Sequence, residues 1–157
     1  MSEDGTRIKG RDTLLQYSAA AVATLSTSAT LTAATYVTIA DQVDDTINDE
    51  YETFTVDVKG QKFADTETAA RKFGVTTNIK AKKGSATLAA LKAAYEAGTK
   101  LAFRTLDGPV AAGTTGECFI GVITKFPRSR PLGDVVSNDI EIAKTSSLVE
   151  PVPITLT

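Results

Sequence analysis

The sequence predicts a mainly β fold of the α+β class, an antiparallel β-sandwich or open barrel with one flanking α-helix. Threonine, which favours strands, occurs 24 times in the 157 residues. Several segments alternate apolar and polar residues with the period of two that a half-buried strand requires. Only one segment combines strong helix formers with capping residues. A chain of this length can bury one core, so we expect a single domain over residues 1–157.

The first 34 residues or so are expected to form an extended N-terminal arm that precedes a core at about 35–146. Residues 18–34 are mostly Ala, Ser and Thr without a clear period, which is typical of an arm or of weakly specified strands. Residues 13–40 carry no charge, but eleven of these 28 are Ser, Thr or Gln, so we expect no membrane span. The first four residues include two acids where a secretory signal is positive.

The next segments predict a short strand followed by a long hairpin. Residues 36–39 are aromatic and β-branched and form the short strand. Apolar residues at 54, 56 and 58 alternate with polar ones, which predicts a half-buried strand. Residues 59–61, Lys-Gly-Gln, predict the turn, and residues 73–81 predict a second strand.

A helix is expected at about residues 85–97. Ser85 is a suitable N-cap, the next twelve residues are dominated by Ala and Leu, and Gly98 suits a left-handed C-terminal position. Leu88, Leu91 and Tyr95 form one narrow apolar stripe. We therefore expect these three side chains to pack the helix against the sheet.

The rest of the chain predicts strands. Residues 117–126 are apolar on both alternating faces, which indicates a central strand covered on both sides. Prolines at 127 and 131 keep the segment between them extended. Prolines at 151 and 153 indicate a C-terminal arm at about 147–157. The remaining expected strands lie at residues 101–106 and 135–143.

The composition excludes several kinds of active site. The chain has no histidine, so a Ser-His-Asp triad, a Cys-His pair and a histidine-bound zinc are excluded. The lone cysteine, Cys118, lies in an apolar strand and is expected to be inert. No phosphate-binding loop and no EF-hand spacing occur. We therefore expect no cofactor, no metal and no enzymatic activity.

Charge is divided along the chain. Residues 1–57 hold ten acids and three bases, whereas residues 58–104 hold ten bases and three acids. Seven of the acids fall between residues 41 and 57, with no base among them. One interpretation is a solvated acidic loop beside an unrelated basic face. The other is a bipolar subunit whose acidic patch meets the basic patch of a neighbour.

The order of elements resembles the major tail tube proteins of long-tailed, siphovirus-type bacteriophages. The local resemblance lies in the second half: Tyr95-Glu-Ala-Gly-Thr at the end of the helix, then Lys-Leu-Ala-Phe-Arg-Thr-Leu at 100–106. It continues with Phe-Ile-Gly-Val-Ile-Thr-Lys-Phe at 119–126 and the strand within residues 133–144. Residues 60–62 match the hairpin region more loosely.

The resemblance implies a structural virion protein that forms stacked hexameric rings, with long hairpins from six subunits closing an inner barrel. Such a tube is assembled in the host cytoplasm and carries double-stranded DNA through its lumen without binding it specifically. The implied partners are the protein itself, a tape-measure protein, a tail terminator and a distal tail protein. The alternative is a β-sandwich binding or head-decoration module that forms no tube.

The resemblance places the hairpin towards the lumen, and a DNA conduit should repel phosphate. We therefore expect part of the acidic cluster to face the lumen or the seam between rings, and basic residues to pair with it across a subunit boundary. The acids are Asp44, Asp45, Asp49, Glu50 and Glu52. The basic partners are drawn from Lys59, Lys62, Arg71 and Lys72.

Overall fold

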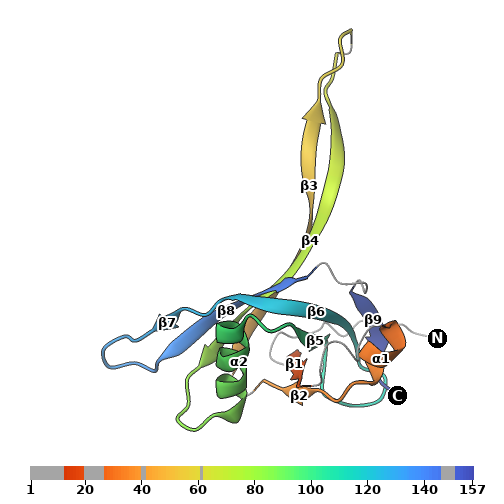
Figure 1. Ribbon diagram of the computed structural model, residues 1–157. Helices are drawn as coiled ribbons and strands as arrows, with labels where there is room; N and C mark the ends of the chain where they lie inside the picture. Colours follow the sequence, from red (N-terminus) through yellow and green to blue (C-terminus); the bar gives the residue numbers. More distant parts are fainter. Residues whose placement is uncertain (1–12, 20–26, 40–41, 61, 146–150) are drawn as a thin grey trace, which may run out of the picture.

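The protein consists of a layered body from which one long β-hairpin projects (Figure 1). The computed structural model describes residues 13–19, 27–39, 42–60, 62–145 and 151–157. The first half contains β1 (Leu14–Ser18), α1 (Ser28–Ala33), β2 (Val37–Thr38), β3 (Gln42–Val56) and β4 (Asp65–Lys80). The second half contains α2 (Ala86–Ala97), β5 (Leu101–Leu106), β6 (Thr115–Lys125), β7 (Arg128–Ser129), β8 (Ser137–Lys144) and β9 (Val152–Thr155).

Within the described residues, the nine strands form one antiparallel sheet. Its main order is β2-β1-β5-β6-β8-β4-β3, with β7 on β8 and β9 on β6. The predicted mainly β, antiparallel fold class is confirmed. Neither described helix is long and apolar enough to cross a membrane.

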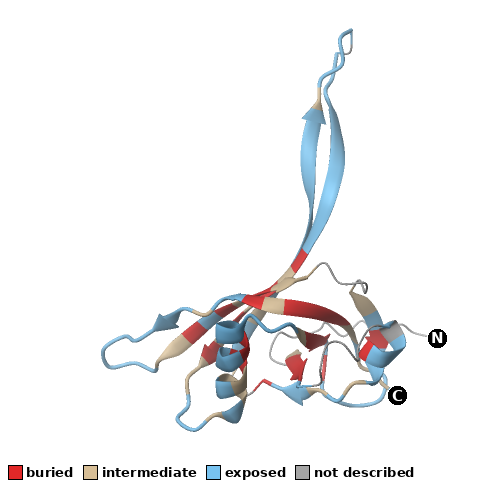
Figure 2. Ribbon diagram, in the orientation of Figure 1, coloured by how far each residue is buried: buried red, intermediate tan, exposed pale blue. Residues whose placement is uncertain are grey.

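β6 is the centre of the body because both of its faces are buried (Figure 2). On one face, Phe119 packs edge-on against Phe73 and stacks with Phe103, with ring centroids 5.0 and 5.7 Å apart. On the other face, Cys118 and Ile120 join a second hydrophobic cluster. The prediction of a central strand covered on both sides is confirmed.

The helix prediction is also confirmed, at both ends. The Ser85 hydroxyl accepts a hydrogen bond from the Leu88 N–H at 3.3 Å, and Gly98 ends the helix in the left-handed region at a φ of 65°. Leu91 is fully buried in the first cluster and Leu88 packs against it. Tyr95 remains 40% exposed and stacks on Phe126, with ring centroids 5.8 Å apart. Leu88 and Leu91 therefore pack α2 against the sheet, and Tyr95 contacts Phe126 just after β6.

The expectation of an N-terminal arm over the first 34 residues is wrong where the chain is described. β1 pairs with β5, and Leu15 is buried in the first cluster. Part of the Ala/Ser/Thr run forms α1, which begins with reciprocal hydrogen bonds between Thr27 and Thr30. Leu31 is buried and anchors this helix on the second cluster. Residues 1–12 and 20–26 lie outside the described part of the chain.

The expectation of a C-terminal arm is wrong for residues 152–155. β9 pairs with the first half of β6, and Ile154 is only 7% exposed. The Leu156 N–H continues the attachment by donating to the Thr114 carbonyl at 2.8 Å. Pro153 is compatible with this strand because β9 pairs only with β6, and the backbone groups on the outer side of an edge strand form no ladder hydrogen bonds. Residues 146–150 lie outside the described part.

Candidate assembly surface

The hairpin of β3 and β4 is much longer than the sheet that supports it. Only residues 74–80 of β4 pair with β8, whereas the pairing of β4 with β3 continues to Asp65. We call residues 49–56 and 65–73, which lie beyond this support, the distal ribbon. The ribbon is exposed along nearly its whole length (Figure 2). A two-stranded ribbon in water is marginally stable, and among the described residues no third strand pairs with this one.

β3 begins earlier in the sequence than expected and includes most of the acidic segment. The acids at residues 44–52 lie inside a regular strand and not in a loop, because β3 begins at Gln42. The predicted half-buried alternation around residue 54 also fails, since Phe54 is 47% exposed. The other apolar side chains of β3 at Val43, Ile47 and Tyr51 are likewise 45–57% exposed.

β3 is also an edge strand. Among the described residues no strand lies on its outer side, so its outward N–H and C=O groups are open to pairing. Exposed edges of this length invite another chain to add a strand. The edge is therefore a surface on which a second subunit can continue the sheet.

The register of β3, β4 and β8 defines a polar face on the sheet. Asp44 lies beside Asn78, which lies beside Asp139, and Thr76 lies beside Glu141. Side chains alternate across a strand, so the neighbouring positions point into the core on the opposite side. We call this surface the polar face; its members are Asp44, Thr46, Asn48, Glu50, Lys72, Thr76, Asn78, Lys80, Asp139 and Glu141.

Hydrogen bonds fix side chains of the polar face across strands. The Asn78 amide donates to the Asp139 carboxylate, and the Asn48 amide donates to the Thr76 hydroxyl at 3.4 Å. Lys125 approaches Glu141 with its nitrogen 3.4 Å from the carboxylate. The surface thus combines four carboxylates with three nearby lysines and is tied together across strands, and neither described helix lies over it in Figure 1.

The five acids of the expected cluster do not share one surface. Asp44 and Glu50 lie on the polar face, whereas Asp45 and Asp49 alternate onto the side of the core. Asp45 is partly buried, and this burial raises the pKa of its carboxyl. The Thr13 hydroxyl donates to that carboxyl at 3.5 Å, which partly opposes the shift.

Two of the expected basic partners form ion pairs within the subunit. Arg71 donates from two nitrogens to Asp49, at 2.7 and 2.5 Å, and holds the pKa of that carboxyl below its usual value. Lys72 lies 2.5 Å from Glu52, and this hydrogen bond raises the pKa of the lysine. Both pairs join the two strands of the ribbon. Lys59 lies in the turn and Lys62 just beyond it.

The distal ribbon changes register at Glu52. Tyr51 pairs with Arg71 and Thr53 with Thr68, so β4 has one more residue than β3 in this interval. This is a β-bulge, which locally increases twist. Beyond it, Phe54 pairs with Glu67 and Val56 with Asp65. One face of the ribbon end therefore holds Phe54, Val56, Asp65 and Glu67, and the other holds Thr53, Thr55, Thr66 and Thr68.

Sequence reasoning missed Asp139 and Glu141 as members of the acidic surface. Their alternation with the buried Ile140 and Ile142 in β8 could have predicted that both acids lie on the exposed side of that strand. The alternation shows that they point away from the core, but only the strand order places β8 beside β4.

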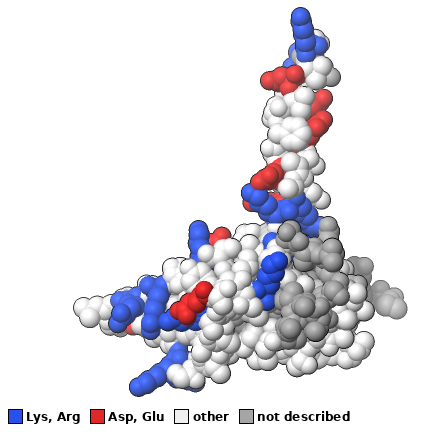
Figure 3. Space-filling model, in the orientation of Figure 1, with Lys and Arg blue, Asp and Glu red and all other residues white. Residues whose placement is uncertain are grey.

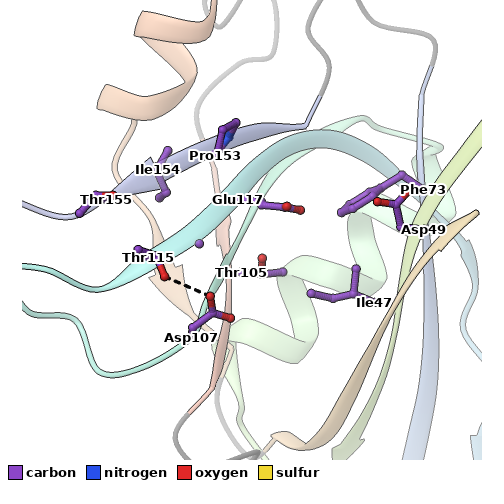
Figure 4. Close-up of a pocket in the computed structure, with 11 residues that line it drawn as sticks. Ile47, Asp49, Phe73, Thr105, Asp107, Thr115, Glu117, Pro153, Ile154 and Thr155 are labelled. Carbon is purple, nitrogen blue, oxygen red and sulfur yellow. Dashed lines mark hydrogen bonds between the residues drawn. The ribbon is translucent and has the colours of Figure 1, made fainter. Parts of the chain in front are cut away.

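A cleft of about 390 Å³ separates the base of the hairpin from β5, β6 and β9 (Figure 4). Ile47 and Phe73 form its apolar wall, and Glu117 points into it from β6. Asp107 lies at its end and accepts a hydrogen bond from the Thr115 hydroxyl at 3.2 Å. No group of three or more potential metal ligands converges within the described residues.

Cys118 lies in a polar network beneath α1. Burial raises the pKa of its thiol and disfavours the reactive thiolate. Arg104 stacks over the Tyr36 ring at 4.5 Å and donates to Gln16 at 2.7 Å, while the Tyr36 hydroxyl donates to the Leu31 carbonyl at 2.7 Å. These contacts attach the N-terminal elements to β5.

Three solved structures are similar to this fold over nearly the whole chain. The SPP1 tail tube superimposes with a TM-score of 0.73 at 13% identity, over 95% of this chain and 80% of that chain. The tail of an empty gene transfer agent particle, refined with C6 symmetry, gives 0.65 at 14% identity, over 95% and 98%. The native gene transfer agent virion gives 0.63 at 14%, over 94% and 98%.

No protein-family model and no curated protein matches the sequence. The chain has the fold of these tail proteins over nearly its full length, so the resemblance expected from the sequence is confirmed at the level of the fold.

Proposed function

We propose that the chain is the repeating subunit of a viral tail tube, a virion component built of stacked hexameric rings. The observation that carries this proposal is the projecting hairpin, with its exposed distal ribbon and the open edge of β3. Such an edge is a liability in a monomer, whereas closing a sheet through six subunits removes it. Likeness to the C6-symmetric tail of a gene transfer agent supports the same arrangement.

The polar face is the proposed lining of the lumen. Its four carboxylates, at Asp44, Glu50, Asp139 and Glu141, outnumber the lysines at Lys72, Lys80 and Lys125. The excess of negative charge would disfavour phosphate and let double-stranded DNA pass without specific binding. α2 lies against the opposite side of the sheet and is proposed to face outward. In the proposed tube, Lys59 and Lys62 near the hairpin tip remain the candidates for pairing with acids of a neighbouring ring.

The other proposed partners follow from the position of such a tube in a tail. A tape-measure protein would occupy its lumen during assembly, and a terminator and a distal tail protein would cover its two ends. Assembly in the host cytoplasm is part of the same proposal.

Electron microscopy of the purified protein tests the assembly proposal. We expect rings or tubes of uniform diameter whose averaged cross-section has six-fold symmetry. Discrete dimers or trimers at every concentration, without rings or tubes, would instead support the alternative of a binding or head-decoration module.

Labelling of single cysteines tests the lining proposal in assembled tubes. Asp139→Cys should react with a small maleimide but not with a maleimide attached to a folded protein, because the latter cannot enter a narrow lumen. Glu96→Cys on the exposed side of α2 is the control and should react with both. Equal labelling of the two variants by the bulky reagent would place the polar face on the outside.

A further inference from the structure

A second surface of the body lies beside α2. A groove of about 570 Å³ runs between the N-terminal half of α2 and the segment from β6 to β7. Its floor is apolar and includes Leu88, Ala89 and Phe126. Lys82, Lys92 and Arg128 line it, and none of the described lining residues is acidic. We call it the basic groove.

The cations of the basic groove are available for a partner. Lys82, Lys92 and Arg128 are exposed, and no ion pair joins them to an acid among the described residues. Figure 3 shows basic side chains gathered over the end of the body that carries β7. An apolar floor with a cationic rim fits an apolar segment that also carries carboxylates.

The end of the distal ribbon has that chemistry. Phe54 is 47% exposed and lies directly across from Glu67, and Val56 lies across from Asp65. Neither Asp65 nor Glu67 has an ion-pair partner in the part of the chain that the structure describes. This face, here called the acidic-apolar face, consists of Phe54, Val56, Asp65 and Glu67.

The two surfaces of one subunit cannot meet. The ribbon points away from the body, and α2 lies on the body at the far end of the hairpin (Figure 1). None of the residues that line the groove belongs to the hairpin. Contact between them therefore requires two copies, in a head-to-tail arrangement that can repeat.

We infer that the acidic-apolar face of the distal ribbon docks in the basic groove of a second copy of this chain. Phe54 and Val56 fill the floor against Leu88 and Phe126, while Asp65 and Glu67 approach the lysines and the arginine of the rim. Burial of the apolar pair supplies affinity, and the charges set the register of the contact. The inference rests on the proposed tube and specifies one contact between its subunits.

Cross-linking in assembled protein tests the contact. A Phe54→Cys variant and a Leu88→Cys variant are mixed, assembled and oxidised; Cys118 is retained because it is fully buried. We expect a disulfide-linked dimer containing one copy of each variant. Thr55→Cys mixed with Leu88→Cys is the matched control, because Thr55 is the next residue on the opposite face of the ribbon, and it should give little of that dimer.

The outcomes separate this contact from the tube itself. Tubes without the Phe54–Leu88 link, or with equal linking from Thr55, would overturn the docking and leave the tube intact. Wild-type protein that forms no tubes or rings would instead remove the proposed function.

Charge reversal provides a second measurement if the cysteine variants fail to assemble. Glu67→Lys or Lys92→Glu alone should raise the concentration needed for assembly at least about tenfold, and the double variant should restore it. Glu96→Lys, on the same helix but outside the groove, should leave assembly unchanged. Single variants that assemble like wild type, or a double variant that restores nothing, would contradict the inference.

Discussion

β6 and the end of β3 are both strands with apolar side chains, yet their surroundings are opposite. Residues 118–121 of β6 are buried on both faces, between two hydrophobic clusters. Residues 53–55 of β3 are exposed on both faces, although they include a phenylalanine. The body therefore obtains its stability from its own core. The ribbon has no such core among the described residues, and in the proposed tube another subunit supplies it.

Shortening the chain in each region should give the largest contrast. Deleting residues 151–157 removes β9 and leaves the second hydrophobic cluster without Ile154. We therefore expect a subunit that melts at least about 10 °C lower or fails to fold. Joining Tyr51 to Arg71 through Asn-Gly removes the ribbon end at a paired position. This second variant should melt within a few degrees of wild type but should not form tubes. Calorimetry and electron microscopy measure the two effects.

A pair of matched substitutions should sharpen the contrast. Phe119→Ala should lower the free energy of unfolding of the isolated subunit by about 3–5 kcal/mol, because it opens a cavity between Phe73 and Phe103. Phe54→Ala should change it by less than about 0.5 kcal/mol, because that ring is half exposed. Denaturant titration measures both; equal losses would mean that the ribbon packs within its own subunit.

The smallest expected effect lies where the hairpin joins the body, at Asp45. Burial raises the pKa of this carboxyl in the folded state, so its stability contribution is complete below the unfolded pKa of about 4 and is lost as pH rises through the folded value. Asp45→Asn should therefore stabilise the subunit at pH 7, by up to about 1 kcal/mol, and give no gain at pH 3. Thermal melts across this range test it, with Asp57→Asn in the exposed turn as the control. A constant difference at all pH values would exclude the ionisation as the cause.

Local signals predicted the body well. The helix follows from Ser85, Gly98 and the Ala/Leu segment between them, because capping and helix propensity act over a few residues. The central strand follows from its apolar composition. β9 was missed because its two neighbouring prolines suggested an arm, and α1 was missed because Leu31 is a single apolar anchor in an Ala/Ser/Thr run.

The hairpin was harder to predict because burial does not mark it. Residues 42–52 of β3 lack the one-sided apolar alternation from which strand length is inferred, so β3 was expected to start near residue 53 and starts at Gln42. The acidic cluster was visible in the composition, but its division between two faces depends on strand register. The contribution of Asp139 and Glu141 depends on strand order, which local sequence does not encode.

The extra residue of β4 opposite Glu52 also restricts how the hairpin can change length in evolution. Beyond this bulge, removing one residue from each strand would turn Phe54 and Glu67 to the opposite face, whereas removing two from each would keep their direction. Insertions and deletions in the ribbon should therefore come in even steps per strand among chains that share the contact. An odd step would need a second bulge to restore it, so hairpin lengths in such a lineage should obey a parity rule.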